Sequence, residues 1–179
     1  MANRKSVFPS LTILNQGYGV GARRITVSTV GMVPGILELA ERPEQFRLAL
    51  SLHAPETELR GSLIPLEKRH PLPELLEALK KFDDGGGKRI TFEYTMIGGI
   101  NDDLALAPKL AKIANQVRAF VNLIPFNPIP YQDWLPSPPE QIRAFAAVLG
   151  SVTGAVSRWG TPSYCPISTR FGSIRINRT

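Results

Sequence analysis

The sequence of 179 residues predicts an α/β protein in which parallel strands alternate with crossover helices. Two observations carry this prediction. Strand and helix patterns alternate from residue 24 to about residue 157, and each strand pattern ends at a polar residue or a turn. The composition, with 43% hydrophobic and 20% charged residues, is that of a folded domain and not of a disordered chain.

The first three elements form a strand–helix–strand unit. Residues 24–29 are mostly β-branched, which predicts a strand. Pro34 follows and favours the first turn of a short helix over residues 35–41. Residues 46–52 are largely apolar and predict the second strand.

The alternation continues to the end of the pattern. The sequence predicts helices over residues 72–82, from about 104 to 117 and from about 138 to 149, and strands over residues 90–96, 120–124 and 152–157. Asn101, Asp102 and Asp103 are typical of a helix cap. Ser137 and Glu140 match a capping box with Pro138 at the first helical position.

Charge and cysteine content limit the chemistry. The single cysteine excludes an internal disulfide framework and any metal site built from several thiolates of this chain. Residues 1–140 carry 16 basic and 15 acidic side chains, and residues 141–179 carry five arginines and no acidic side chain, so their net charges are +1 and +5. The basic end fits either contact with a polyanion such as RNA or a solvated tail.

No segment is long and apolar enough for a membrane span or a signal peptide, which favours the cytoplasm.

Several polar residues near strand ends are candidates for a site. Ser51 and His53 follow a predicted strand, but no acidic residue is placed to orient the imidazole, so ligand hydrogen bonding or a turn at Pro55 is favoured over a hydrolase triad. Asn122 and Asn127 flank an apolar stretch, where an amide either caps a turn or holds a ligand.

Other candidates have simpler explanations. His70 lies beside Lys68 and Arg69, which favours a surface position. The glycine-rich run 17–21 precedes a strand, whereas a dinucleotide loop follows one, so it predicts an ordinary loop. Cys165 is either a nucleophile, with nearby arginines lowering its pKa, or an inert thiol.

Three ordered segments together resemble one enzyme family. They are Ala-Arg-Arg-Ile-Thr-Val-Ser-Thr-Val-Gly at 22–31, Leu-Ser-Leu-His-Ala-Pro at 50–55 and Asn-Leu-Ile-Pro-Phe-Asn-Pro at 122–128. Glu93, Tyr94 and Asn101 fit the same pattern. The chain is similar, over residues 11–158, to the RlmN/Cfr family of radical S-adenosylmethionine (SAM) enzymes, which methylate an adenine of 23S rRNA and, in the RlmN branch, also tRNA.

The resemblance implies a partial TIM-type α/β barrel whose N-terminal strands are absent. It implies a lead-in segment over residues 1–22, the partial barrel over 23–158 and a divergent basic tail over 159–179. By motif position, the SAM contacts are Ser28, Ser51, Leu52, His53 and Asn127. Cys165 lies near the place of the family's methyl-carrying cysteine, although its neighbours differ from the family pattern.

The family holds a [4Fe–4S] cluster on an upstream CxxxCxxC loop that these residues do not contain. The resemblance therefore implies a C-terminal part that is inactive alone, with 23S rRNA and tRNA as the family's partners and no choice between the C2 and C8 positions of adenine. A separate chain that supplies the cluster half is one alternative, and a non-catalytic SAM- or RNA-binding remnant is another. A barrel enzyme for a phosphorylated small molecule would need a phosphate loop that the sequence does not show.

Overall fold

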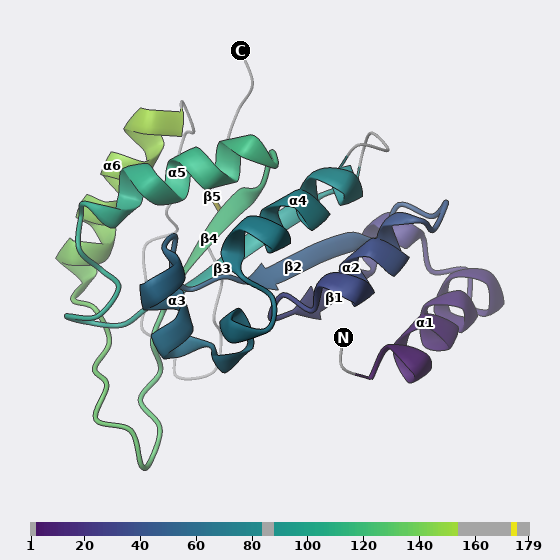
Figure 1. The fold of residues 1–179 in the computed structure, drawn as a ribbon, viewed down its shortest axis with the longest axis horizontal. Coiled ribbons are helices and arrows are strands. Elements are labelled where there is room, and N and C mark those ends of the chain that lie inside the picture. Colours follow the sequence, from purple (N-terminus) through teal and green to yellow (C-terminus); the bar gives the residue numbers. More distant parts are fainter. Residues whose placement is uncertain (1–2, 84–87, 154–172, 175–179) are drawn as a thin grey trace.

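The computed structural model describes residues 3–83, 88–153 and 173–174, and these form a sheet with helices packed on one face (Figure 1). The strands are β1 (Thr26–Thr29), β2 (Arg47–Ser51), β3 (Ile90–Met96), β4 (Phe120–Pro125) and β5 (Ser173–Ile174). The helices are α1 (Arg4–Thr12), α2 (Val33–Ala40), α3 (Thr57–Leu63), α4 (Leu72–Asp83), α5 (Leu106–Gln116) and α6 (Pro139–Thr153).

The sheet has the strand order β1-β2-β3-β4-β5. β1 to β4 pair in parallel, and β5 pairs antiparallel with β4. Each parallel connection runs through a helix, as parallel strands require. The carboxyl ends of the first four strands therefore meet at one edge of the sheet. This arrangement confirms the predicted α/β class, and the described helices include none that could cross a membrane.

Alternation along the strands separates two faces of the sheet. One face packs against α2, α4 and α5 and consists of buried side chains, which are Val27, Leu48, Leu50, Ile90, Phe92, Tyr94, Met96, Val121 and Leu123. The other face carries more polar residues, which are Ser28, Ser51, Thr91, Glu93, Thr95 and Asn122, and is called the second face below. Burial of the first face supplies most of the core.

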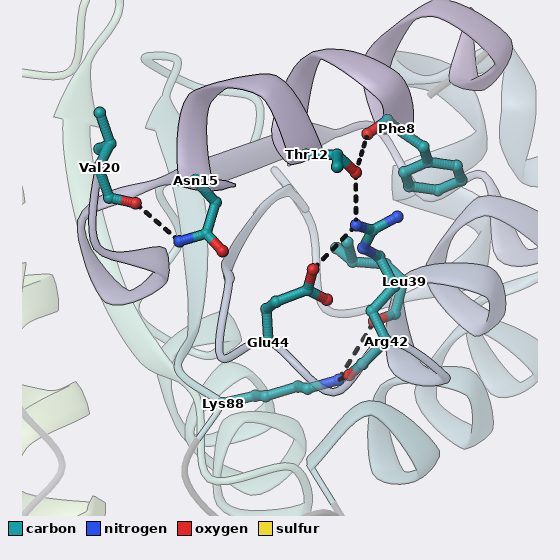
Figure 2. A network of polar contacts seen from close by, with 8 residues as sticks. All are labelled: Phe8, Thr12, Asn15, Val20, Leu39, Arg42, Glu44 and Lys88. Carbon is teal, nitrogen blue, oxygen red and sulfur yellow. Dashed lines mark hydrogen bonds and ion pairs between the residues drawn. The ribbon is translucent and has the colours of Figure 1, made fainter. Parts of the chain in front are cut away.

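A buried polar network fastens α1 and α2 near the amino ends of the strands (Figure 2). Lys88 Nζ donates hydrogen bonds to the carbonyls of Leu39, Ala40 and Arg42, at 3.2, 2.8 and 2.7 Å. Arg42 Nη2 donates to Thr12 Oγ1 of α1 at 2.9 Å and to Glu44 Oε1 at 3.0 Å. A cation at the carbonyl end of α2 is stabilising, because these groups have no partner within the helix.

The structure corrects three details of the sequence-based prediction. α5 begins at Leu106, and Asp103 Oδ1 accepts from the Ala105 N–H at 2.9 Å just before it, whereas Asn101 and Asp102 accept from Ile97 and Gly99 and do not cap the helix. Ser137 Oγ is buried without a hydrogen-bond partner among the described residues, so the capping box is not formed. Val152 and Thr153 continue α6 instead of starting a strand, and the rest of that predicted strand lies outside the described residues.

Two helices had no counterpart in the prediction. α1 falls in the lead-in segment, contains Pro9, and still contributes Phe8 and Leu11 to the common core. α3 is two turns long and begins shortly after β2. Short helices of this kind depend on tertiary contacts more than on their own periodicity.

Candidate functional site

The second face brings polar side chains of neighbouring strands into rows. Ser28 lies beside Ala49 and Thr91, and one row further toward the carboxyl edge Ser51 lies beside Glu93 and Asn122. In parallel α/β sheets, ligands bind at the carboxyl ends of the strands. The second face near this edge is therefore the candidate site.

His53 stands at the end of β2 in a fixed orientation. Its backbone has a positive φ of 58°, and its Nδ1 accepts a hydrogen bond from the Thr95 backbone N–H at 3.0 Å. Because Nδ1 is an acceptor, the proton of the neutral ring is on Nε2, which is left as a donor. Burial, with a smaller effect of the Arg60 charge, lowers the pKa of His53 to about 4. His53 is therefore neutral at pH 7.

Asn101 ties the ends of β2 and β3 together. Its fully buried side chain donates to the carbonyls of His53 and Thr95, at 2.8 and 2.7 Å, and accepts from the Ile97 N–H at 2.7 Å. Its own carbonyl accepts a hydrogen bond from Tyr94 Oη at 2.8 Å. These contacts satisfy backbone groups that the sheet ladder leaves open at its edge, and they hold the His53 backbone in place.

Arg60 connects α3 to the turn after β1. It is completely buried, forms an ion pair with Glu67, and donates from Nη2 to the Val30 carbonyl at 2.7 Å. Glu67 Oε1 also accepts from the Leu72 N–H at the start of α4, at 2.6 Å. The adjacent Gly31 has a φ of 108°, and a Cβ there would lie 3.0 Å from Arg60 Nη2. This packing fixes the chain just beyond Ser28.

A carboxylate and an amide form a pair in the middle of the second face. Asn122 Nδ2 donates to Glu93 Oε2 at 2.7 Å. Asn122 Oδ1 is buried and has no partner among the described residues. In the strand predicted over residues 90–96, alternation puts Thr91, Glu93 and Thr95 on one face, but the pairing of Glu93 with Asn122 depends on the register between two strands and was not predictable from the sequence pattern.

The residues singled out from the sequence lie in different surroundings. Ser28 is exposed and Ser51 half-buried on the second face, and Asn127 is exposed just beyond β4. The Leu52 side chain is fully buried and its N–H is bonded to the Glu93 carbonyl, so only its own carbonyl is left for a ligand. Cys165 lies outside the described residues.

His70 contradicts the prediction of a surface position. It is 8% exposed, beside the start of α4, with Nδ1 3.5 Å from Glu74 Oε1. Lys68 and Arg69 are exposed as expected, so the chain turns inward at a single residue. Within residues 3–83 and 88–153, no group of three or more His, Cys, Asp or Glu side chains is arranged to hold a metal ion.

The chain is similar to curated RNA methyltransferases. It is 48% identical over 151 residues to the probable dual-specificity RNA methyltransferase RlmN of Gemmatimonas aurantiaca, across 83% of this chain and 41% of that relative. The corresponding protein of Bacillus subtilis is 43% identical over 151 residues, across 83% of this chain and 42% of that protein. No protein-family model matches the chain.

Solved structures agree with these relatives. A radical SAM methyltransferase from Sphaerobacter thermophilus superposes with a TM-score of 0.80 at 42% identity, across 84% of this chain and 45% of that one. Archaeal TYW1 shares the fold, with a TM-score of 0.57 at 20% identity. The four parallel strands with alternating helices thus match part of a radical SAM barrel. More specifically, the chain is homologous to the RlmN family of radical SAM methyltransferases, and it spans less than half the length of the relatives it matches.

Proposed function

We propose that this chain is the SAM-binding C-terminal part of an RlmN-type RNA adenine methyltransferase that acts in the cytoplasm. The observation that carries the proposal is that the segments 22–31, 50–55 and 122–128, which resemble SAM motifs of the family, reach the carboxyl ends of β1, β2 and β4. In this assignment Ser28, Ser51, Leu52, His53 and Asn127 hold SAM, and the RNA substrates are 23S rRNA and tRNA.

The chemistry of these groups fits SAM. SAM presents an amino group, a carboxylate and ribose hydroxyls, which need both donors and acceptors. The serine hydroxyls supply both, His53 Nε2–H is a donor because Nδ1 is already occupied, and the Leu52 carbonyl is an acceptor. Asn122 Oδ1 is buried and has no partner among the described residues, so a donor from a ligand on the second face would fit it. Bound SAM supplies the methyl group of the family reaction.

The [4Fe–4S] cluster of the family does not fit these residues. Three thiolates are required to hold it, and the 179 residues contain one cysteine. We therefore expect no methylation of RNA by the chain alone, and any cluster half must come from elsewhere, for example from a separate chain. Cys165 is the only cysteine available as the methyl carrier.

Direct binding tests the SAM site. Isothermal titration of the 179-residue chain with S-adenosylhomocysteine is expected to show binding that weakens when Ser28 or Asn127 is replaced by alanine. Thr57→Ala, an exposed change at the start of α3, is the matched control. Undiminished binding by both site variants would contradict the assignment. C2-methyladenine formed by the purified chain alone would contradict the expected inactivity.

A second candidate function is a non-catalytic piece that binds SAM or RNA. The absence of cluster ligands favours it. Co-expression with the N-terminal half of a relative separates the two, because restored methylation, together with S-methylation of Cys165 detected by mass spectrometry, would support the split enzyme. A well-folded complex with no methylation would support the non-catalytic piece.

A further inference from the structure

The loop between β4 and α6, residues 126–138, projects well beyond the sheet and is called the β4–α6 loop below (Figure 1). Its turn lies at Pro130 and Tyr131. The Tyr131 side chain is completely exposed, and Ile129 and Leu135, on the two arms of the loop, are each more than half exposed. Single apolar side chains are common on protein surfaces, whereas a group of them on one projecting loop is typical of an interaction site.

The base of the β4–α6 loop is held to the sheet. The Phe126 N–H donates to the Met96 carbonyl at 3.1 Å, and the Gly98 N–H donates to the Leu135 carbonyl at 2.8 Å. The rings of Phe126 and Trp134 pack edge to face, with centroids 5.9 Å apart. The loop also contains four prolines, which restrict its backbone. A restrained loop loses little conformational entropy when its exposed side chains bind a partner.

The position and the charge of the β4–α6 loop select among possible partners. The loop leaves the sheet at its carboxyl edge, and Asn127, near its start, is one of the proposed SAM contacts. A base that receives a methyl group from SAM must approach this edge. Asp133 is the only charged residue of the loop, so the loop offers no cation to a phosphate, although the net charge of +6 on the whole chain attracts a polyanion. An uncharged aromatic ring suits the face of a base instead.

We propose that Tyr131 is a stacking surface for an unpaired base of the RNA substrate. The inference rests on the proposed function, which makes RNA the ligand. Unpaired bases stack on aromatic side chains with little dependence on sequence. The Tyr131 backbone has a φ of 75°, which glycine or asparagine adopts more readily, and strain of this kind is concentrated at functional positions. Tyr131 is thus a positioning residue, which holds RNA beside the site and takes no part in methyl transfer.

Binding of a fluorescently labelled oligoadenylate to the full 179-residue chain, followed by anisotropy, tests this role. Tyr131→Ala is expected to weaken binding by about tenfold, within the range of one base–aromatic stack. An abasic oligoribonucleotide of the same length has the phosphates but no bases, so its affinity should not change. The slope of log affinity against log salt concentration should also stay the same, because no phosphate contact is lost.

Further variants separate stacking from other effects. Tyr131→Trp keeps an aromatic ring and should keep the affinity, whereas Tyr131→Leu keeps apolar surface without a ring and should bind oligoadenylate as weakly as Tyr131→Ala. Tyr18→Ala is the matched control, since Tyr18 is another exposed tyrosine, in the segment before β1. Circular dichroism checks that each variant folds. If a Tyr131 variant does not fold, the wild-type chain decides, because equal affinity for oligoadenylate and the abasic strand overturns the inference.

Other outcomes also overturn the inference. One is a folded Tyr131→Ala chain that binds oligoadenylate as tightly as wild type, and another is a wild-type chain that does not bind oligoadenylate. A third is a wild-type chain that dimerises in sedimentation experiments while Tyr131→Ala stays monomeric, which would assign the loop to a protein contact. The titration with S-adenosylhomocysteine decides the proposed function separately, so the two failures are distinct.

Discussion

The neutral, buried state of His53 has a measurable consequence for stability. Its pKa is about 4 in the folded chain and about 6.5 when unfolded. Between these values the unfolded state binds a proton that the folded state does not, so the free energy of unfolding falls as pH falls from about 6.5 toward 4. From pH 7 to pH 5, this group alone should cost about 2 kcal/mol of stability, and the full effect below pH 4 approaches about 3 kcal/mol.

Urea denaturation at pH 7 and pH 5 measures this effect when wild type is compared with His53→Gln. Glutamine does not titrate, and its carbonyl can accept the Thr95 N–H that the imidazole accepts now. The wild-type chain should lose about 2 kcal/mol more than the variant over this interval. Since the chain has only two histidines, NMR can also follow the His53 ring directly. Equal losses in the two proteins, or a His53 ring that titrates near pH 6.5, would refute the reasoning.

Three further predictions concern stability, each measured by urea denaturation at pH 7. Arg60→Met should destabilise by about 3–5 kcal/mol because it leaves the Glu67 carboxylate buried without its partner, and Arg60→Met with Glu67→Gln should cost less than Arg60→Met alone; a double variant no more stable than the single one would contradict this. Lys88→Met should cost about 2 kcal/mol or more because three carbonyls at the end of α2 lose a charged donor, and an unchanged midpoint would show that water replaces it. Gly31→Ala should cost about 1–3 kcal/mol because of its positive φ and the crowding by Arg60 and Leu75. Gly61→Ala in α3 should not destabilise, because a Cβ at Gly61 would come no closer than 3.7 Å to its neighbours. Equal effects of the two substitutions would refute the steric argument.

Sequence patterns predicted those helices and strands whose positions follow from the local pattern of apolar and polar residues. The alternation of residues 90–96 and the apolar spacing of residues 72–82 each gave the observed element within a residue. α3 was missed because it is only seven residues long and its buried residue, Arg60, is a charged one whose partners, Glu67 and the Val30 carbonyl, lie outside the helix. His70 was misplaced because its exposed neighbours say nothing about the direction of one side chain.

The candidate site also has parts that follow from local sequence patterns and parts that depend on tertiary contacts. The ends of β1 and β2 follow from local patterns, so Ser28 and Ser51 could be placed at the correct edge of the sheet. Asn101 was interpreted as a helix cap because capping is the usual local use of asparagine. Its actual partners, His53 and Thr95, belong to other strands, and only the assembled sheet brings them within reach. The Glu93–Asn122 pair depends on strand register in the same way.

The fastening network around Lys88 lies at the amino ends of the strands, far along the sheet from the edge where Ser51 and His53 stand. Because the two regions are separate, residues of the second face can be changed without disturbing the network around Lys88. A protein engineer could randomise the second face to seek new nucleoside specificities while leaving Arg42 and Lys88 untouched, and the anchoring of the helices would be retained in most library members.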